Sequence, residues 1–378
     1  MNIGDTRIGA RPYIIAELGV NHDGSEERAL ELTRAAADAG ADAVKLQYFE
    51  ADRLMSRAAK LAAYQKAAGE RDPVEMLRRL ELPIEAMGRV ADLAHELGLH
   101  AIVTVFSLEH VPAAAALPWD AFKSASPDIV NRPLLDAMAR TGRPLIVSTG
   151  ASTPEEVSRA VGWLRPYSGR VALLQCVSSY PTPPEHAELA GMAALRALFA
   201  GPVGYSDHTP GTTTGFEAAS LGAEILEKHV TLDRAAPGPD HAASLEPDKF
   251  AWYARAARDP RGAPSLLTPG EFGAAMERIA AVRAAIADAV LRTRVQSLKR
   301  VLPIERDVRS VSRQSLVAAA DLPAGHTLRR TDLTIKRPGT GLAPHELDMC
   351  LGRRLCSAVA ADTPLLAENV EALVRSAS

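Results

Sequence analysis

The sequence predicts an α/β protein, a TIM (β/α)8 barrel followed by a small, mostly β or irregular domain. Over the first 260 residues, eight short apolar runs alternate with amphipathic segments. Consecutive runs lie about 31 residues apart, which is the spacing of βα units in such a barrel. Strands that alternate with helices are typical of a parallel sheet built from right-handed βαβ units. Beyond residue 312 the helical spacing stops, and short apolar runs are separated by turns rich in Pro and Gly.

We expect the barrel strands at the eight apolar runs, which are residues 13–19, 42–49, 100–106, 121–126, 144–150, 170–176, 202–207 and 224–230. Segments such as 25–40 and 153–166 carry Ala, Leu, Glu and Arg at helical spacing and predict helices between the strands. Only the interval between the second and third predicted strands is much longer than the others. Residues 50–82 form an insertion that the barrel topology places over the C-terminal face, as a lid or as a decoration.

The chain is expected to divide into a barrel domain over 1–289, a linker over 290–311 and a small domain over 312–378. Within the first part, the last barrel helix should run over 246–257, and a further helix over 269–289. A unit of about 60 residues buries little core of its own, so we expect the small domain to pack against another surface.

Composition excludes several classes of protein. There are 43 Lys and Arg against 46 Asp and Glu, and a net charge of −3 argues against sequence-independent binding of nucleic acid. The three cysteines, Cys176, Cys350 and Cys356, are too few for a disulfide scaffold and fit a reducing, cytoplasmic setting. No apolar segment is long enough for a membrane span, and the first residues lack the order of a secretion signal.

Polar side chains stand at the C-terminal ends of the predicted strands, where TIM-barrel active sites lie. Two of them are lysines within strand patterns, Lys45 and Lys123. A closed barrel has no edge strand to protect, so we interpret these lysines as anion-binding groups, with a buried ion pair as the alternative. Hydroxyl groups at neighbouring strand ends would complete a site for phosphate or carboxylate: Thr104, Ser126, Ser148 and Ser206.

The last two predicted strands are neighbours in a barrel, and each ends near a histidine. The seventh run is followed by Asp207 and His208, and the eighth carries Lys228 and His229. Two neutral imidazoles on one ion would leave positions open for substrate and water, as a Lewis-acid metal requires. The alternative is a histidine that is hydrogen-bonded to Glu17 or Asp207, without a metal.

Two loop residues and one thiol also lie close to the predicted strand ends. Asp240 follows the eighth strand in a Pro-stiffened loop that should overhang the barrel mouth. Tyr180, in the segment SYPTPPE, either presents a hydroxyl to the site or forms a packing corner. Cys176 has no basic partner nearby in the sequence, so we interpret it as a core thiol rather than a nucleophile.

Nine segments along the chain together resemble one family. They are IIAELGVNHDGS, DAVKLQ, VTVFS, FKSAS, IVSTGAST, SYPTPPE, GYSDHT, EKHVTLDRAAPGPDHAASLEP and KRPGTGL, in this order over residues 10–373. The sequence is similar to the sialic acid synthase family, whose members are a TIM barrel followed by an antifreeze-like (SAF) domain. The resemblance implies condensation of phosphoenolpyruvate with an N-acylated mannosamine-type sugar, which gives phosphate and a nine-carbon 2-keto (nonulosonic) acid.

The resemblance also implies roles for individual residues. Those expected to bind phosphoenolpyruvate are Lys45, Thr104, Lys123, Ser126, Ser148 and Ser206, and those expected to contact the sugar are Gln47, Asp128, Tyr180, Asp240 and Arg337. His208 and His229 match the ligands of one Mn²⁺ or Mg²⁺ ion, and Glu17 sits at the acid/base position. The expected catalytic set is Glu17, Lys45, Lys123 and Asp240. Arg337 matches an arginine that enters the partner's barrel, which implies a domain-swapped homodimer.

Four positions depart from better-known bacterial members of this family. Asp128 stands where many of them have Glu, Ala67 and Ala68 replace a frequent Asn-Thr, and Gln175 replaces a frequent His. The stretch DHAASLEP is more similar to legionaminic acid synthases and spore-coat paralogues than to N-acetylneuraminate enzymes. We therefore expect a legionaminic-type or N-acetylneuraminate-type product without assigning the acceptor, which could be N-acetylmannosamine, its 6-phosphate or a 2,4-diacetamido-6-deoxy analogue.

Three other functions compete with this prediction. A Schiff-base aldolase would use Lys45 or Lys123 as the imine lysine. A synthase that joins phosphoenolpyruvate to another acceptor would give a different 3-deoxy-2-keto sugar acid, but such enzymes lack the appended KRPG-bearing domain. A purely carbohydrate-binding or ice-binding role for the C-terminal unit would not explain polar residues at every strand end.

Overall fold

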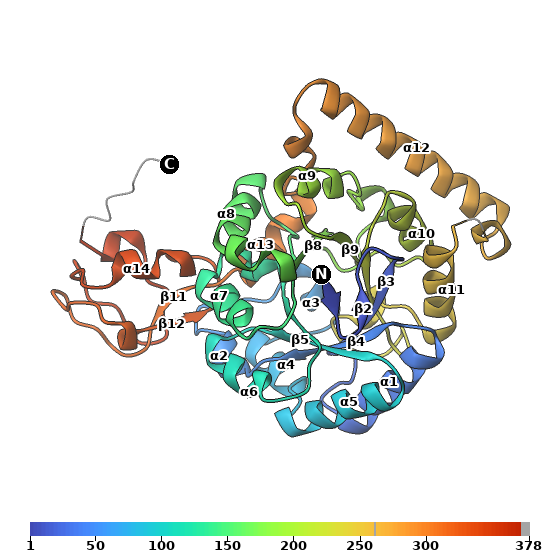
Figure 1. The fold of residues 1–378 in the computed structure, drawn as a ribbon. Helices are drawn as coiled ribbons and strands as arrows, with labels where there is room; N and C mark the ends of the chain where they lie inside the picture. Colours follow the sequence, from blue (N-terminus) through green and yellow to red (C-terminus); the bar gives the residue numbers. More distant parts are fainter. Residues whose placement is uncertain (261, 372–378) are drawn as a thin grey trace.

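The computed structural model of the chain describes residues 1–260 and 262–371. Eight parallel strands close into a barrel in the order β10-β3-β4-β5-β6-β7-β8-β9, which confirms the predicted fold class (Figure 1). Their bounds are β3 Tyr13–Gly19, β4 Ala43–Tyr48, β5 His100–Val105, β6 Ala121–Ser124, β7 Leu145–Ser148, β8 Val171–Cys176, β9 Val203–Asp207 and β10 Ile225–His229. Each predicted apolar run contains one of these strands.

Alternation along the strands turns every second side chain into the barrel. The lower interior is filled by one apolar cluster, which includes Ile15, Ala43, Ile102, Ile146 and Leu174. Two residues further along the same strands, the next inward-facing side chains lie at the mouth of the barrel: Glu17, Lys45, Thr104, Ser148 and Cys176. Each of these strands therefore contributes to both the core and the site, because inward-facing residues are apolar near the N-terminal ends of the strands and mostly polar at their C-terminal ends.

Helices surround the barrel on the outside (Figure 1). Their bounds are α1 Glu26–Asp38, α5 Ile84–Glu96, α6 Val111–Ala115, α7 Arg132–Arg140, α8 Pro154–Leu164, α9 Gly191–Leu198, α10 Thr213–Ser220 and α11 Pro247–Arg258. Side-chain caps define where several of them begin: the Ser25 hydroxyl accepts from the amide of Arg28, and Thr153 and Glu156 form a capping box at α8. Their apolar faces pack on the outward-facing strand residues in one large core.

An N-terminal hairpin that the sequence analysis did not predict closes the lower end of the barrel. It pairs β1 Asn2–Ile3 with β2 Thr6–Arg7 in antiparallel register. Ile3 and Ile8 are buried in the same apolar cluster as the lower strand residues. This end is therefore sealed, and the polar mouth lies at the opposite end.

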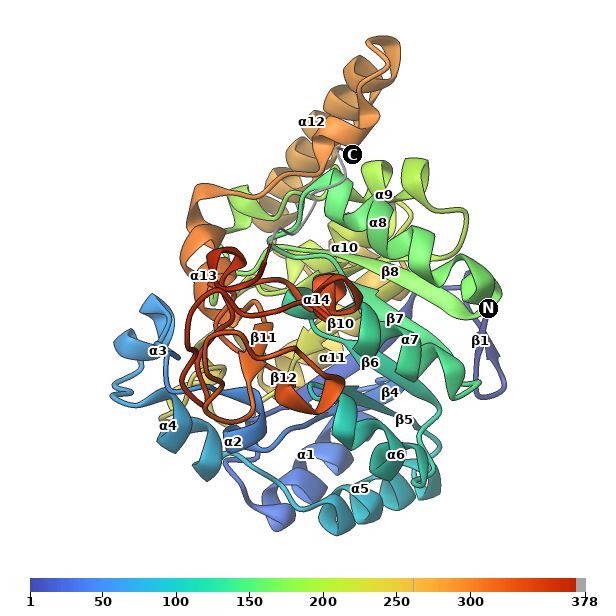
Figure 2. The same cartoon turned by 90° about the vertical axis from the view of Figure 1, so that its left-hand side faces the viewer.

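Two segments cover the mouth (Figure 2). The insertion after β4 folds into α2 Ala51–Leu54, α3 Ala63–Ala67 and α4 Pro73–Arg79. The C-terminal unit contains α13 Arg306–Ser312, β11 Ser315–Ala318, β12 Leu333–Lys336 and α14 Leu347–Cys350, and it has a small apolar core of its own. Residues 372–378 of the predicted 312–378 domain lie outside the described residues. The end of β12 pairs with the insertion, because the amide of Arg337 donates to the Leu54 carbonyl at 2.8 Å.

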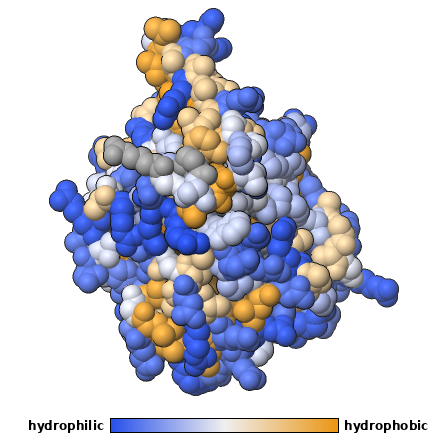
Figure 3. Space-filling model, turned by 90° about the vertical axis from the view of Figure 1, so that its right-hand side faces the viewer, coloured by the Kyte–Doolittle hydropathy of each residue, from blue (hydrophilic) through white to orange (hydrophobic). Residues whose placement is uncertain are grey.

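Helix α12, Pro269–Leu291, leads from the last barrel helix toward the C-terminal unit and lies on the outside of the barrel, where its Ala275 and Ile279 pack with Phe216 of α10 (Figure 1). Figure 3 shows apolar side chains on the projection at the top of the molecule, in contrast to the mostly hydrophilic face below it. Val290 and Leu291, at the end of α12, are exposed. Among the described residues, no helix combines the length and the apolar character that crossing a membrane requires.

Candidate active site

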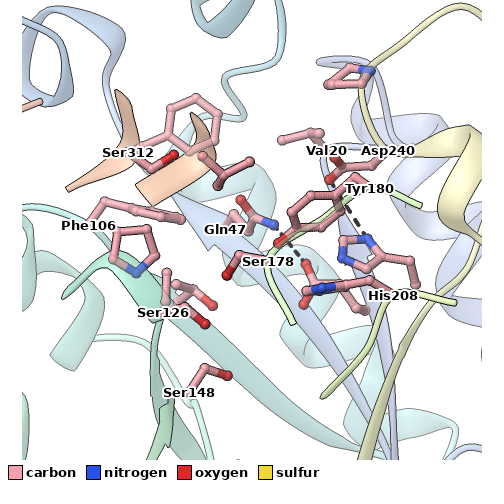
Figure 4. Close-up of a pocket in the computed structure, with 18 of the residues that line it drawn as sticks. Val20, Gln47, Phe106, Ser126, Ser148, Ser178, Tyr180, His208, Asp240 and Ser312 are labelled. Atoms are coloured by element: carbon pink, nitrogen blue, oxygen red, sulfur yellow. Dashed lines mark hydrogen bonds and ion pairs between the residues drawn. The ribbon is translucent and has the colours of Figure 1, made fainter. Parts of the chain in front are cut away.

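A cavity of about 140 Å³ occupies the C-terminal mouth of the barrel (Figure 4). Thirteen of the fourteen predicted site residues line it: Glu17, Lys45, Gln47, Thr104, Lys123, Ser126, Ser148, Tyr180, Ser206, His208, His229, Asp240 and Arg337. Figure 4 shows Ser126 and Ser148 on one side and Tyr180, His208 and Asp240 on the other. The exception is Asp128, which is fully buried and is not among the lining residues. We call the side of the cavity with Ser126 and Ser148 the anion half, and the side with Tyr180, His208 and Asp240 the acceptor half.

The anion half contains the two predicted lysines. The Nζ atom of Lys45 donates to the Thr104 hydroxyl at 3.0 Å, and Nζ of Lys123 donates to the Ser148 hydroxyl at 2.6 Å. Both ammonium groups are buried beside hydroxyl groups that can turn toward a ligand. Burial makes such charges costly unless they are paired, so this arrangement favours an anion at the same place.

Two buried carboxylates neutralise these lysines in the free protein. Glu17 forms a salt bridge with Lys45. Glu227 lies 3.6 Å from Nζ of Lys45 and 4.0 Å from Nζ of Lys123, and its Oε1 accepts from the Ser206 hydroxyl at 2.8 Å. The buried ion pair left open by the sequence analysis is thus present, in the same place as the predicted anion site.

The two carboxylates differ in their affinity for a proton. Burial raises the pKa of Glu17 above its ordinary value, although Lys45 opposes this. Burial also acts on Glu227, but Lys123 and Lys45 outweigh it and lower the pKa of Glu227 to about 2. Glu227 is therefore a permanent counter-ion, whereas Glu17 is suited to take up and release a proton.

The imidazole rings of His208 and His229 lie side by side, with centroids 5.6 Å apart. The Nδ1 atom of His208 is 2.7 Å from the Val177 carbonyl, which orients the ring and leaves Nε2 for another partner. The Nδ1 atom of His229 is buried without a hydrogen-bond partner within the described structure and lies 3.7 Å from Asp240. An unpartnered ring nitrogen beside a second imidazole fits a metal ion with open coordination positions.

Charges around these rings differ. Burial and the charge of His208 lower the pKa of His229 well below 6.5, so this ring is neutral. Burial also lowers the pKa of His208, but the neighbouring Cys176 thiol outweighs it and raises the value to about 9. Within the described ranges, no three His, Cys, Asp or Glu side chains form a metal-binding group. The two imidazoles would thus need ligands from substrate and water.

The acceptor half is built from loops. Gln47 connects it to the anion half, because its Nε2 donates to Glu17 at 3.0 Å. Tyr180 packs its ring 4.1 Å from that of His208 and 5.0 Å from that of Tyr64, measured between centroids. Asp240 lies over His229, and burial raises its pKa to about 6. An aromatic wall beside carboxylate and amide groups can hold a molecule with hydroxyl groups and an apolar face.

Asp128 is buried behind the lining, on the segment after β6 that begins with Ser126, and it faces the charge of Arg337, which lines the cavity. Neither carboxylate oxygen of Asp128 has a hydrogen-bond partner among the described residues, and burial raises its pKa to about 7 although Arg337 and Arg313 oppose this. The guanidinium of Arg337 lies over the Phe106 ring at 5.4 Å. In the single chain described, Arg337 enters the cavity of its own barrel, and its exchange between subunits stays a prediction.

The lining residues that were not predicted from the sequence include Glu227, Tyr64, Phe106 and Ser312. Glu227 could have been found, because it stands two residues before His229 on β10 and so shares its inward face. Tyr64 belongs to the insertion after β4, so the predicted place of this insertion over the mouth is confirmed. Ala67 and Ala68 are not among the lining residues. Phe106 follows Thr104 by two residues at the end of a predicted strand and could have been found by the same rule, whereas Ser312 has no local sequence signal.

Two polar residues at strand ends face away from the mouth. Lys228 points into the helix layer, where its Nζ lies 3.2 Å from Asp207. Gln175 also faces outward, and its side chain donates to the Glu188 carbonyl at 3.2 Å. Cys176 is buried as predicted, and the fold supplies the basic neighbour that it lacks in the sequence, because its Sγ is 3.6 Å from Nδ1 of His208.

Comparison with known proteins places these features in a family. Residues 32–263 match the profile of the NeuB family, and residues 313–371 match that of the SAF domain. An N,N'-diacetyllegionaminic acid synthase of Legionella pneumophila is 36% identical over 367 residues, which is 95% of each chain.

Solved structures agree with this result. The spore coat polysaccharide biosynthesis protein SpsE of Bacillus subtilis is similar with a TM-score of 0.75 and 27% identity, covering 98% of this chain and 99% of that one. A sialic acid synthetase of Leptospira borgpetersenii in complex with citrate has a TM-score of 0.61 and 29% identity, covering 75% of this chain and 97% of that one.

Proposed function

The chain belongs to the NeuB family of sialic acid synthases, and from that premise we propose that it condenses phosphoenolpyruvate with an N-acylmannosamine-type sugar. The products are phosphate and a nonulosonic acid, of the legionaminic type by similarity to the Legionella relative. One observation supports this most directly: two buried lysines and four hydroxyl groups form an anion half that adjoins a pair of imidazoles. A Schiff-base aldolase would need an unprotonated lysine, whereas Lys45 is paired with Glu17 and Glu227; the borohydride experiment below tests Lys123.

Phosphoenolpyruvate would bind in the anion half. Its carboxylate and phosphate groups carry the negative charge that Lys45 and Lys123 can balance, and the Thr104, Ser126, Ser148 and Ser206 hydroxyls would donate to its oxygens. Glu227 holds the lysines in place before the ligand arrives. The same positive charges would stabilise the negative charge that develops on the phosphate-bearing group during the reaction.

The reaction forms a C–C bond, adds water to the phosphate-bearing carbon and breaks the C–O bond between that carbon and phosphate. The enol carbon of phosphoenolpyruvate attacks the aldehyde carbon of the open-chain sugar, whose oxygen takes up a proton. Water adds to the phosphate-bearing carbon with loss of a proton, and the adduct collapses to the 2-keto acid as phosphate leaves with the bridging oxygen. Glu17 would orient this water and accept its proton, since its carboxylate is buried beside Lys45 and its pKa is raised by burial. Gln47, which donates to Glu17, would keep that carboxylate in position.

His208 and His229 would hold one Mn²⁺ or Mg²⁺ ion. When bound, such an ion polarises a carbonyl oxygen and makes its carbon a better electrophile. The chain's own residues prepare that site: the Val177 carbonyl fixes the His208 ring, and Asp240 lies next to His229. Because a ring nitrogen must be unprotonated to bind the ion, metal affinity should fall as the pH is lowered, and isothermal titration at two pH values would measure this.

The acceptor sugar would lie between the aromatic rings of Tyr64 and Tyr180 and the polar groups of Gln47, Asp240 and Arg337. Asp128 is one methylene shorter than the Glu of many relatives and lies outside the cavity lining. We therefore propose that Asp128 acts on the sugar through Arg337, whose charge it faces.

The deciding experiment measures phosphate release with phosphoenolpyruvate, Mn²⁺ and three acceptors. These are N-acetylmannosamine, its 6-phosphate and the 2,4-diacetamido-6-deoxy mannose analogue. We expect release with the diacetamido sugar and loss of release in EDTA. Inactivation by borohydride in the presence of substrate, with full activity in EDTA, would instead support the aldolase. Binding of phosphoenolpyruvate without release would direct the search to another acceptor.

We also propose that the active enzyme is a homodimer in which Arg337 crosses to the partner barrel. The exposed apolar end of α12 and the separate core of the C-terminal unit are compatible with such an exchange. Co-expression of Glu17→Gln chains with Arg337→Ala chains tests it at low sugar concentration. If the arginine crosses, mixed dimers regain one intact site, whereas an arginine that serves its own chain gives no recovery.

A further inference from the structure

The carboxylate of Glu305, just before α13, binds two loops of the barrel mouth. It belongs to the predicted linker and is 1% exposed. Its Oε1 accepts from the amide of Ala151 at 2.6 Å and from the amide of Ser178 at 2.8 Å. Its Oε2 accepts from the amide of Leu302 at 2.8 Å. One side chain from outside the barrel thus joins the segments that follow β7 and β8.

The segment after β7 needs this support because its backbone is strained. Ala151 has a φ of 48°, in the left-handed region that residues with a Cβ rarely occupy. Its carbonyl accepts from Arg309 and, at 2.9 Å, from Arg313. Three side chains between residues 305 and 313 therefore hold both polar groups of one strained residue.

This strained segment determines where the hydroxyls of the anion half lie. The amide of Gly150 donates to the Ser126 hydroxyl at 2.9 Å, and Ser148 is two residues earlier on the same strand. A Cβ on Gly150 would lie 2.3 Å from the Ser178 hydroxyl and 2.7 Å from that of Ser126, so the packing is tight. If the Ala151 segment relaxed, it would displace these serines, because no space separates them from it.

We infer that Glu305 is a positioning residue for the phosphoenolpyruvate subsite, through its hydrogen bonds to the amides of Ala151 and Ser178. This rests on the proposed function. Docking of residues 305–313 would then complete the anion half of the barrel in the same chain. Without this docking, Lys45 and Lys123 would keep their places on the strands, but the hydroxyls of Ser126 and Ser148 would be held less firmly.

The test compares Glu305→Ala and Glu305→Gln with Arg300→Ala in the full-length protein. Arg300 is the matched control, since it also joins this part of the chain to the barrel, through Glu188 at 2.8 Å near the far end of the segment after β8, and it does not contact the amides of Ala151 and Ser178. Phosphoenolpyruvate binding is measured by titration calorimetry, and KM for both substrates by phosphate release. We expect Glu305→Ala to weaken phosphoenolpyruvate binding about 10-fold or more, with the acceptor KM within about 2-fold. Glu305→Gln should fall between, and Arg300→Ala should match the wild type.

A second variant separates positioning from a merely structural role. Glycine adopts a positive φ without strain, so Ala151→Gly combined with Glu305→Ala should recover at least about threefold of the lost affinity. Unchanged phosphoenolpyruvate binding in Glu305→Ala would overturn the role of Glu305. So would an equal loss for both substrates that Ala151→Gly does not relieve. A wild-type protein that binds no phosphoenolpyruvate would overturn the proposed function, and this assignment with it.

Discussion

The two halves of the cavity are built in opposite ways. In the anion half, charged groups come from β3, β4, β6 and β10 and neutralise one another, as Lys45 does with Glu17 and Glu227. In the acceptor half, apart from His229 at the end of β10 and Gln47 on β4, polar atoms come from loops, the insertion and the C-terminal unit, and several lack hydrogen-bond partners within the described structure. These include Nδ1 of His229 and Nε of Arg337, and both oxygens of Asp128 behind the lining.

This difference suggests how the two substrates are recognised. A site whose charges neutralise one another keeps its shape without ligand, and a bound anion can replace a carboxylate as the partner of a lysine. A site with unpaired groups is costly to the folded protein and gains most when a ligand supplies the missing partners. We therefore expect changes in the anion half to reduce both stability and turnover, and some changes in the acceptor half to increase stability while reducing sugar binding.

The largest effect is expected for Glu17→Gln. The amide cannot accept the proton of the attacking water, so kcat should fall about 10²- to 10⁴-fold. Phosphoenolpyruvate binding should stay within a few fold, because Glu227 still balances Lys45. Rapid-quench turnover and calorimetric binding of phosphoenolpyruvate measure the two quantities. Retained turnover would show that another group handles the proton.

Lys45→Met tests whether the anion half is a connected charge network. Methionine keeps the volume but leaves Glu17 and Glu227 without their nearest cation, so the free energy of unfolding should fall by about 3 kcal/mol at pH 8. Lower pH should reduce this loss, because Glu17, whose pKa is raised, becomes protonated first. Urea unfolding at both pH values measures it. Equal stability to wild type at pH 8 would mean that the lysine is not part of the network.

The anion half could be predicted from sequence because its residues lie on strands. A strand position and a period of two place Lys45, Thr104 and Ser148 in the mouth without further information. The same rule, applied to β10, places Glu227 inward and Lys228 outward. This was not predicted, because alternation was not applied within the end of that strand.

The acceptor half required tertiary structure. Tyr64 comes from an insertion whose path over the mouth has no periodic pattern, and Ser312 comes from α13, more than 100 residues beyond the loop that carries Tyr180. Only the family resemblance pointed to Arg337, because a lone arginine in a turn carries no local signal. The hairpin β1–β2 was missed for a related reason, since two-residue strands are too short for an alternation pattern.

Arg337→Ala should separate the two halves in kinetics. Loss of one charge-assisted contact should raise the acceptor KM about 10- to 100-fold, while the phosphoenolpyruvate KM changes by less than about threefold. Lys336→Ala is the matched control, since this neighbouring cation pairs with Asp362 within the C-terminal unit at 2.7 Å. Equal effects of the two substitutions on both substrates would mean that docking of the unit, and not its arginine, determines sugar binding.

Asp128→Asn is the smallest of these effects and the one that most directly tests the contrast between the halves. The pKa of Asp128 in the folded protein is about 7, against an ordinary value of 3.8. Between these values the folded state keeps a proton that the unfolded chain has lost, so wild-type stability falls as the pH rises from about 4 to 7.

An asparagine does not titrate, so Asp128→Asn should remove this loss and raise the free energy of unfolding at pH 8 by about 1–2 kcal/mol, with little change at pH 4. Asp38→Asn, on the exposed surface of α1, should show no such pH-dependent gain. Sugar KM should rise less than in Arg337→Ala, since Asp128 acts through that arginine. If Asp128→Asn is instead less stable at pH 8, the carboxylate has a partner in the folded protein, and the acceptor half is as well balanced as the anion half.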